Sequence, residues 1–332
     1  MVSPFQQKPG PTVASERFSR LADARAKISP VSTPRDFALA YAIAEQIGVP
    51  ASGCREIIGQ GTVNHVFVAA TAEGELVVRF HRDPLDVDDY AGEEWCLKSL
   101  KGEVPVPNCV AVGACQGISF IVQTFEEGEN ADGRRSPELW RTLGRYAKTI
   151  NETPLDASAP ESLFPRFGRD LLCNWHRHID YNLAELTPAD ELLKIGAYEM
   201  KHQDELKRAF SNLRHRVTRF GLTHGDLVPK NVLLPPCSPP VVIDWGSAGT
   251  GAAPFHDYMR IRQDEAEEAF TDDDLEQFAA GYGSPVRELA STMDDLSLLG
   301  KIDKVRWAID KRPDRVKPST ARAREEVLRR FG

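Results

Sequence analysis

Long apolar runs, a signal-peptide-like start and an excess of positive charge are all missing from this sequence of 332 residues. No segment approaches the roughly 18 consecutive apolar residues that a transmembrane helix requires. The N-terminus, residues 1–34, is polar and has no apolar core. We therefore expect a cytoplasmic protein without a membrane partner. The net charge of −8 also disfavours a nucleic-acid partner.

Closely spaced cysteine pairs are missing too. The six cysteines include no Cys-x-x-Cys arrangement. In a chain of this length, the absence of this arrangement predicts reduced and mostly buried thiols instead of a disulfide scaffold or a zinc site. The hydrophobic content of 41% and the charged content of 27% are typical of a globular protein.

Charge is unevenly distributed near the C-terminus. Residues 264–295 contain eleven Asp or Glu and one Arg, whereas residues 296–332 contain eleven Lys or Arg and five acids. An acidic block of this kind is typical of a solvated helix face. The alternative is that it helps to recruit a cationic substrate.

Apolar spacing and breaker residues divide the chain into a loose N-terminal arm and two lobes. The arm is residues 1–34, with a short helix around 14–28; the N-lobe is 35–127 and the C-lobe is 128–332. In the N-lobe the pattern predicts helices over 35–47 and 88–100, and strands over 55–58, 63–69, 76–80, 110–112 and 118–123. In the C-lobe it predicts helices over 136–150, 190–220 and 264–280 and in the tail from 318. The predicted fold class is α+β, a small β-rich lobe followed by a larger helical lobe.

The strongest chemical signal lies in two short segments of the C-lobe. Residues 224–234 read His-Gly-Asp-Leu-Val-Pro-Lys-Asn-Val-Leu-Leu, and residues 241–246 read Val-Val-Ile-Asp-Trp-Gly. In kinases, a catalytic-loop Asp accepts the proton of the substrate hydroxyl. An Asn five residues later and the Asp of Asp-Phe-Gly hold Mg²⁺ beside the phosphates of ATP. This spacing predicts Asp226 as the catalytic residue, and Asn231 and Asp244 as ligands of Mg²⁺.

The physical need for these residue types is clear. The phosphates of ATP are polyanionic, so hard oxygen ligands must hold Mg²⁺ against them. The apolar runs 232–234 and 241–243 are predicted to form a hairpin that keeps the ligands rigid. The alternative is a surface loop in which Asp and Asn are ordinary turn residues.

His-Gly-Asp with an Asn five residues later, followed by Ile-Asp-Trp, resembles the aminoglycoside phosphotransferase and choline kinase family. Gly251, Pro254 and Asp257 follow Asp244 closely, as in the family, and leave no room for a long activation segment. The resemblance covers roughly residues 54–260. It implies a protein-kinase-like two-lobed fold, the cofactors ATP and Mg²⁺, and an Asp257 that braces the catalytic loop.

The N-lobe carries a segment that looks like the family's phosphate-covering loop. Residues 58–64 read Ile-Gly-Gln-Gly-Thr-Val-Asn. Glycines let the backbone approach phosphate oxygens and point N–H groups at them. The resemblance therefore implies nucleotide contacts from Gly59, Gly61, Thr62 and Asn64. The alternative is an ordinary hairpin turn.

An arginine stands on the strand that carries the nucleotide lysine in protein kinases. The resemblance implies that Arg79 binds the α- and β-phosphates and pairs with a carboxylate of the next helix. Helical spacing makes Glu93 the better partner and Glu94 the second. The alternative is that Arg79 is a surface arginine beside a solvated glutamate.

Residues 120–128 resemble the strand and hinge that join the lobes, and this implies that backbone groups near Gln123 and Phe125 bind adenine. Two regions depart from the family pattern. Thr-Ile-Asn, residues 149–151, stands where the family usually has Leu-His. The aromatic segment 164–175 resembles a substrate-side insert only weakly, and core packing is the commoner role of such a cluster.

The resemblance implies an ATP-dependent phosphotransferase that moves the γ-phosphate to a hydroxyl of a small molecule. An aminoglycoside-type antibiotic, and hence a role in antibiotic resistance, is the leading acceptor from the family and the acidic block. The alternatives are choline, homoserine or a sugar. A nucleotide-binding pseudokinase and a protein kinase also remain open. The sequence predicts no oligomeric state and does not separate ATP from GTP.

Overall fold

The computed structural model describes residues 32–57, 64–81, 90–165, 168–262 and 270–332. The chain forms two compact units, each built from segments that are far apart in the sequence. Among the described residues, unit 1 comprises Phe164–Phe220 and Ser284–Gly332, and unit 2 comprises 32–163 and Gly221–Gly283. The division into lobes at residue 127 stays a prediction.

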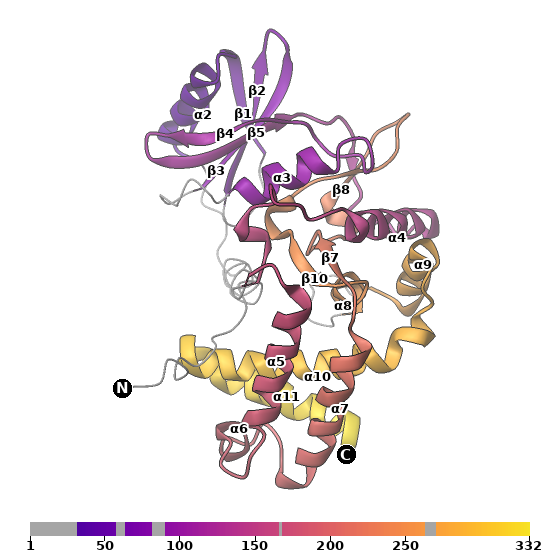
Figure 1. The fold of residues 1–332 in the computed structure, drawn as a ribbon. Coiled ribbons are helices and arrows are strands. Elements are labelled where there is room, and N and C mark those ends of the chain that lie inside the picture. Colours follow the sequence, from indigo (N-terminus) through magenta and orange to yellow (C-terminus); the bar gives the residue numbers. More distant parts are fainter. Residues whose placement is uncertain (1–31, 58–63, 82–89, 166–167, 263–269) are drawn as a thin grey trace. The chain divides into compact units, whose positions relative to one another are not determined.

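Unit 2 contains a five-stranded antiparallel sheet with the order β1-β2-β3-β5-β4 (Figure 1). The strands are β1 (Ala51–Glu56), β2 (Asn64–Thr71), β3 (Gly74–His81), β4 (Cys109–Cys115) and β5 (Ile118–Thr124). A tight turn joins β2 to β3, where Gly74 has a φ of 127° that side-chain-bearing residues rarely adopt. Each predicted N-lobe strand corresponds to one of these five.

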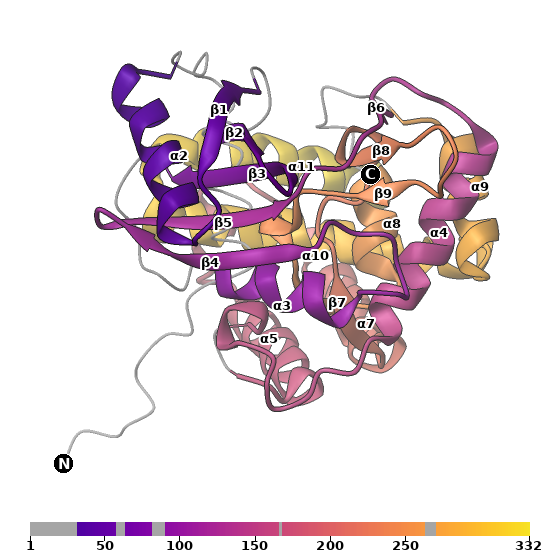
Figure 2. The ribbon, with the colours of Figure 1, turned by 90° about the horizontal axis from the view of Figure 1, so that it is seen from above.

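Two helices accompany the sheet. Helix α2 (Pro34–Gln46) begins at Thr33, whose capping box with Asp36 satisfies the first backbone N–H groups. Its apolar residues Leu39 and Ile43 belong to one buried cluster with residues of the sheet. Figure 2 shows α2 beside the sheet. Helix α3 (Ala91–Ser99) contacts β4 on one side and the 3₁₀ turn Trp245–Ser247 on the other.

Short strands and three more helices complete unit 2. Strand β6 (Glu129–Asn130) joins β8 (Val232–Leu234) and β9 (Val241–Val242) in a three-stranded sheet, and β7 (Phe220–Thr223) pairs with β10 (Gly249–Ala252). The predicted hairpin of residues 232–234 and 241–243 is present as β8 and β9. The helices are α4 (Pro137–Glu152), α8 (Phe255–Arg262) and α9 (Asp272–Tyr282).

Unit 1 is helical and differs from the sequence prediction. Its helices are α5 (Leu171–Glu185), α6 (Glu191–Lys194), α7 (Gln203–Arg216), α10 (Val286–Lys311) and α11 (Val316–Phe331). The single helix predicted over 190–220 is wrong, because Gly196 turns the chain with a φ of 78° after α6. Helices α5 and α10 were not predicted, whereas α11 confirms the helical tail. Within the described ranges, no helix is long and apolar enough to cross a membrane.

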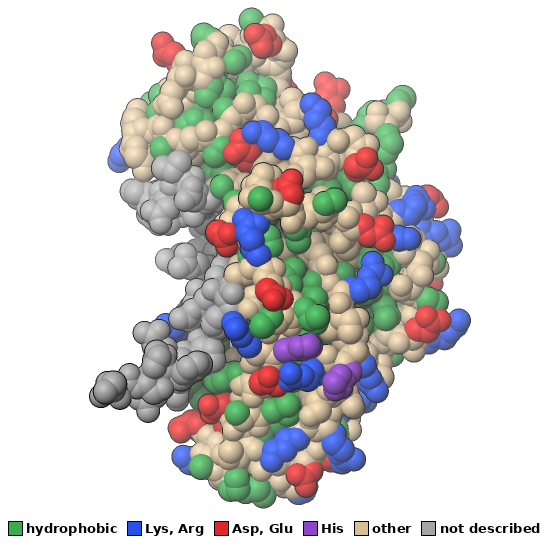
Figure 3. All heavy atoms as spheres, viewed as in Figure 1, with side chains coloured by type: hydrophobic (Ala, Val, Ile, Leu, Met, Phe, Trp, Pro, Cys, Tyr) green, Lys and Arg blue, Asp and Glu red, His purple; other side chains and the backbone are tan. Residues whose placement is uncertain are grey.

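Three acids in the described part of the acidic block, Asp274, Asp294 and Asp295, are engaged with arginines or a helix cap. In unit 1, Arg330 lies 3.4 Å from Asp294 and 3.2 Å from Asp295, so the basic tail pairs with the end of the block. In unit 2, Asp274 caps helix α9 and lies 3.6 Å from Arg135. Acidic and basic side chains are interspersed on the face shown in Figure 3. This arrangement favours a structural role over recruitment of a cationic substrate.

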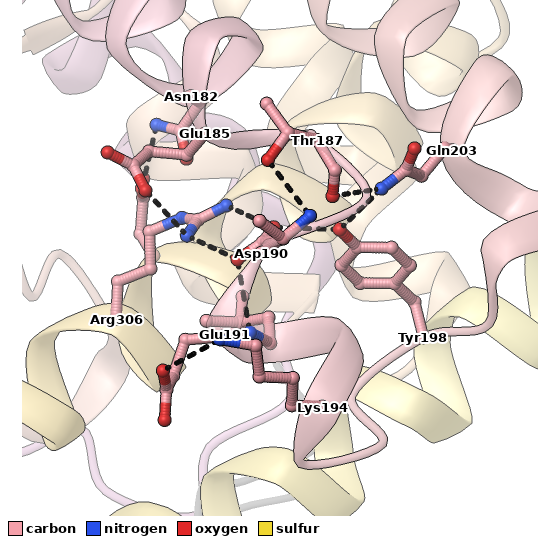
Figure 4. A network of polar contacts seen from close by, with 12 residues as sticks. Asn182, Glu185, Thr187, Asp190, Glu191, Lys194, Tyr198, Gln203 and Arg306 are labelled. Carbon is pink, nitrogen blue, oxygen red and sulfur yellow. Dashed lines mark hydrogen bonds and ion pairs between the residues drawn. The ribbon is translucent and has the colours of Figure 1, made fainter.

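A buried polar network ties α10 to the segment around α6 (Figure 4). The Arg306 guanidinium donates to both oxygens of Asp190, at 3.0 and 2.9 Å. The Tyr198 hydroxyl donates to the same carboxylate at 2.7 Å. Bidentate Arg–carboxylate pairs fix geometry as well as charge, so this network determines how α10 packs within unit 1.

Candidate active site

The loop between β7 and β8 is fixed by His224, which is fully buried. The Asp226 backbone N–H donates to His224 Nδ1 at 3.3 Å, so the ring proton lies on Nε2, which is 3.0 Å from the Ile243 carbonyl oxygen. The ring also packs edge-on against Trp245, with centroids 4.5 Å apart. Burial lowers the pKa of His224. The imidazole is therefore a neutral bridge between the two predicted motifs.

Gly225 is required at its position by both conformation and space. Its φ is 80°, and a Cβ there would lie 2.2 Å from the Ser247 carbonyl oxygen. Only glycine allows this close approach, and the turn at Gly225 separates the buried His224 from Asp226. The backbone geometry therefore explains why glycine stands between His224 and Asp226.

Four polar contacts surround the Asp226 carboxylate. Arg260 donates from Nε to Oδ1 at 2.6 Å, and its Nη2 lies 2.6 Å from the same oxygen. Lys230 Nζ lies 3.0 Å from Oδ2, to which Asn231 Nδ2 also donates at 3.0 Å. Burial raises the pKa of Asp226, but Arg260 and Lys230 outweigh it and lower the pKa to about 2. Asp226 is therefore ionised at neutral pH.

Asn231 and Asp244 are the predicted metal ligands. The Asn231 amide nitrogen donates to the Asp226 backbone oxygen at 2.8 Å as well as to its carboxylate, which leaves Oδ1 of Asn231 as the available oxygen. Asp244 has a φ of 61°, a left-handed conformation that is strained for most side-chain-bearing residues. Its side chain is 56% exposed.

A buried ion pair joins β3 to α3, as predicted from spacing. Arg79 Nη1 lies 2.6 Å from Glu93 Oε1, and Arg79 Nη2 lies 3.3 Å from Asp244 Oδ1. Burial opposes the charge of Arg79, but Glu93 and Asp244 outweigh it and raise the pKa of Arg79. Glu94 instead pairs with Lys98. The arginine thus connects the sheet, helix α3 and a predicted metal ligand.

Gln123 and Phe125 are engaged in ways that the sequence did not predict. The Gln123 side chain is buried and donates from Nε2 to Glu93 Oε1 at 2.9 Å. The Phe125 backbone N–H donates to the Glu75 carbonyl oxygen at 3.2 Å. A nucleotide would therefore meet the carbonyl of Phe125 and not its N–H group.

The residues present fit a bound nucleotide and Mg²⁺. Asn64 Oδ1 and Glu93 Oε2 are buried and have no hydrogen-bond partner among the described residues. The described residues include no group of three or more His, Cys, Asp and Glu side chains that could hold a metal ion. Two oxygens, from Asn231 and Asp244, suit Mg²⁺ because this ion usually takes its other ligands from phosphates and water. Gly59, Gly61 and Thr62 lie outside the described residues.

Asn151 and Asp257 connect the strand before the predicted catalytic loop to the helices of unit 2. Asn151 donates to the Leu222 carbonyl oxygen at 2.8 Å and to Asp257 Oδ2 at 3.1 Å, and it accepts from the Tyr282 hydroxyl at 2.9 Å. Burial raises the pKa of Asp257 to about 7. The departure from Leu-His at 149–151 thus places a polar side chain that holds β7.

Sequence reasoning missed two functional candidates, Asn151 and Arg260. Arg260 lies on α8, and its spacing of three residues from Asp257 is the only signal in the sequence that could have drawn attention to it. The aromatic segment 164–175 is engaged in packing where it is described. Phe164 is buried beneath Arg169, and Trp175 donates to the Leu213 carbonyl oxygen.

Comparison with known proteins identifies a family and several solved structures with a similar fold. The profile of the phosphotransferase enzyme family matches residues 55–294. No curated protein sequence matches the chain. Among solved structures, the chain is similar to the GDP and kanamycin complex of APH(2")-IIia, with 18% identity, a TM-score of 0.59, and coverage of 87% of this chain and 98% of that one.

Two further structures have a similar fold. The apoenzyme of the macrolide 2'-phosphotransferase MphH from Brachybacterium faecium has 20% identity and a TM-score of 0.56, with coverage of 87% of this chain and 97% of that one. A thermostable mutant of aminoglycoside phosphotransferase APH(4)-Ia, in a ternary complex with ADP and hygromycin B, has 16% identity and a TM-score of 0.56, with coverage of 89% and 99%. The predicted fold class, a small antiparallel sheet and a larger helical region of the kinase-like type, is confirmed.

Proposed function

The chain belongs to the phosphotransferase enzyme family, and we propose that it transfers the γ-phosphate of ATP to a hydroxyl group of a small molecule. The observation that carries this proposal is the set of Asp226, Asn231 and Asp244 within one unit, connected by His224 and Arg79. A pseudokinase would be expected to lack one member of such a set. ADP or GDP in the complexes of similar structures supports the nucleotide.

Each residue has a role that follows from its charge and surroundings. Arg79, held by Glu93, would bind the α- and β-phosphates, while the segment of Gly59, Gly61, Thr62 and Asn64 would cover them. Asn231 and Asp244 would hold Mg²⁺, which neutralises phosphate charge during transfer. Adenine would meet the backbone near Gln123 and the carbonyl of Phe125.

Asp226 would orient the acceptor hydroxyl for in-line attack on the γ-phosphate. A carboxylate with a pKa of about 2 is a weak base at neutral pH. It therefore accepts a hydrogen bond from the hydroxyl at the outset and the proton only as the new O–P bond forms. Catalysis then rests mainly on position and on electrostatic stabilisation of the phosphates.

The acceptor has two candidate classes. The complexes of similar structures with kanamycin and hygromycin B support an aminoglycoside-type antibiotic. A metabolite hydroxyl is the second class, and one observation favours it. Two cationic side chains, Arg260 and Lys230, lie directly on Asp226, where a polycationic acceptor would be repelled.

The test is Asp226→Asn, which keeps the shape of the side chain and removes its charge. We expect Mg²⁺-dependent ADP release with an acceptor to fall by about 10³-fold, while ATP affinity changes by less than about threefold. The matched control is Asp132→Asn, at an exposed position of unit 2, which should behave as wild type. Normal turnover in Asp226→Asn would contradict the proposal, and ATP binding without turnover by any wild-type preparation would favour a pseudokinase.

A further inference from the structure

Four nitrogen atoms of neighbouring side chains already lie within 3.0 Å of the Asp226 carboxylate oxygens, and a substrate has to compete with them. A carboxylate offers about four lone-pair sites, two on each oxygen. Arg260 Nε and Nη2 both lie 2.6 Å from Oδ1, and Lys230 Nζ and Asn231 Nδ2 both lie 3.0 Å from Oδ2. An acceptor hydroxyl can donate to Asp226 only after one of these donors has left.

Asn231 is not the donor that leaves. Its amide nitrogen must face Asp226 for its Oδ1 to remain available to Mg²⁺, and it is held by the Asp226 backbone oxygen as well. Lys230 shares Oδ2 with Asn231, so a hydroxyl that took the place of Lys230 would still have to share this oxygen with the Asn231 amide. Oδ1 faces helix α8 instead, where Arg260 is its recorded donor.

Arg260 therefore has to move if a hydroxyl is to reach Oδ1. Its side chain is only 13% exposed, so leaving Asp226 would deprive a partly buried guanidinium of its counter-charge. Such a loss is costly unless another anion takes over. The neighbouring His256 provides none, because an imidazole is either neutral or cationic; burial and then Arg260 lower its pKa to about 4, so it is neutral here.

We propose that the acceptor carries an anionic group, a carboxylate or a phosphate, near the hydroxyl that is phosphorylated, and that Arg260 exchanges Asp226 for this group on binding. The exchange keeps the guanidinium paired and opens Oδ1 to the hydroxyl. A neutral acceptor leaves Arg260 unpaired, and a polycationic one adds repulsion from Arg260 and Lys230. Arg260 is thus a specificity-determining residue that touches the substrate. This inference rests on the proposed phosphotransfer.

The experiment uses two series of compounds that differ in charge on one scaffold. The first is glycerol, glycerate and glycerol 3-phosphate; the second is glucose, glucosamine, glucuronate and glucose 6-phosphate, with kanamycin as a polycation. Binding is measured by calorimetry on the full chain loaded with Mg²⁺ and a non-hydrolysable ATP analogue, and ADP release is measured separately with ATP. The carboxylate and phosphate members of each series show which anion is preferred.

We expect an anionic member of at least one series to bind about tenfold or more tightly than its neutral counterpart, a difference that is readily measured. In Arg260→Gln this preference should fall below about threefold, whereas Arg262→Gln, two residues along the same helix, should retain it. The inference is overturned if no anionic member is preferred, if kanamycin or glucosamine binds more tightly, or if Arg260→Gln keeps the preference. Anion binding without ADP release would count against the phosphotransfer and not against the recognition.

Discussion

The two carboxylate oxygens of Glu93 differ in their hydrogen-bond partners. Oε1 accepts from Arg79 at 2.6 Å and from Gln123 at 2.9 Å, whereas Oε2 is buried and has no hydrogen-bond partner among the residues that the structure describes. A buried carboxylate is stable only while its charge is compensated. Gln123 therefore acts through Glu93 on the position of Arg79, so a side chain on β5 helps to position the proposed phosphate-binding group on β3.

Replacing Gln123 by leucine tests this chain of contacts. The change removes one of the two donors to a buried oxygen, so we expect a loss of about 1–2 kcal/mol in the free energy of unfolding. The KM for ATP should rise by roughly three- to tenfold with a smaller change in kcat, because Arg79 is less well fixed. Urea unfolding and steady-state kinetics measure both. Gln277→Leu is the matched control, since Gln277 bonds with an exposed Asp273; an equal effect there would refute the argument.

Contacts between individual residues could be predicted where the family resemblance and the spacing of the residues along the chain indicate which side chains meet. The Arg79–Glu93 pair is recognisable because a strand arginine precedes a helix with glutamate on its inner face. Arg260 could not be predicted, since its contact with Asp226 spans 34 positions and depends on how α8 packs. Asn151 departs from the family pattern, but a polar residue at a helix end does not reveal which backbone groups it will contact.

At the scale of elements, α4 and α9 approach each other through glycines. A Cβ on Gly144 would lie 2.0 Å from the Phe278 carbonyl oxygen, and a Cβ on Gly281 would lie 2.0 Å from the Arg141 carbonyl oxygen. Such distances require the two backbones to be in direct contact. The crossing also carries Asn151 at the end of α4 and Tyr282 at the end of α9, which are joined by a hydrogen bond. Helix packing and site geometry therefore depend on the same contact.

Gly144→Ala should destabilise the protein, although alanine is the better helix former. Overpacking of this contact should cost about 3 kcal/mol and raise the unfolded fraction at any given urea concentration. Gly300→Ala is the control, because Gly300 lies on an exposed face of α10 with no atom within 4 Å of the added Cβ. It should gain about 0.5–1 kcal/mol. Chemical denaturation of both variants would reject the interpretation if Gly144→Ala were as stable as Gly300→Ala.

The elements that were predicted correctly have regularly spaced apolar residues, and glycine or proline residues mark their ends. Strands β1 to β5 alternate or are apolar and are separated by glycine turns or prolines. Helix α10 was missed because it buries Thr292, Asp295 and Arg306 together with its apolar residues. Polar residues inside and charges outside remove the apolar stripe on which helix prediction depends. Their partners, such as Asp190 for Arg306, lie too far along the chain to be inferred.

At the scale of the whole molecule, neither unit is a continuous stretch of sequence. The described chain passes between units after Leu163, after Phe220 and after Gly283. Composition and motifs follow the order of the sequence, so they give no sign of these crossings; the division into consecutive lobes stays a prediction. The charges near the C-terminus show the same limitation. The acidic and basic stretches are separate along the sequence, but Asp294 and Asp295 pair with Arg330 in the structure.

Three crossings within the described residues connect the units covalently, so we expect the chain to unfold in one transition that responds to titration in either unit. Burial raises the pKa of Asp257, in unit 2, from 3.8 to about 7. Its folded form therefore binds a proton that the unfolded form has lost, and stability falls as pH rises from about 4 to 7, with a slope of at most about 1.4 kcal/mol per pH unit. In unit 1, burial lowers the pKa of His178, but Asp303 at 2.7 Å outweighs it and raises the pKa above 6.5. Stability from that pair is full below pH 6.5 and is lost as pH rises through the raised value.

The two titrations can be separated by variants and by pH. Asp257→Asn should flatten the pH dependence of the free energy of unfolding between about pH 4 and 7, and His178→Gln should flatten it only above about pH 6.5. Urea denaturation followed by circular dichroism from pH 4 to 9 measures both windows on the same transition. A slope between pH 4 and 7 that survives in Asp257→Asn would show that another group causes it. Two separate transitions, each sensitive to only one variant, would show that the three crossings do not couple the units.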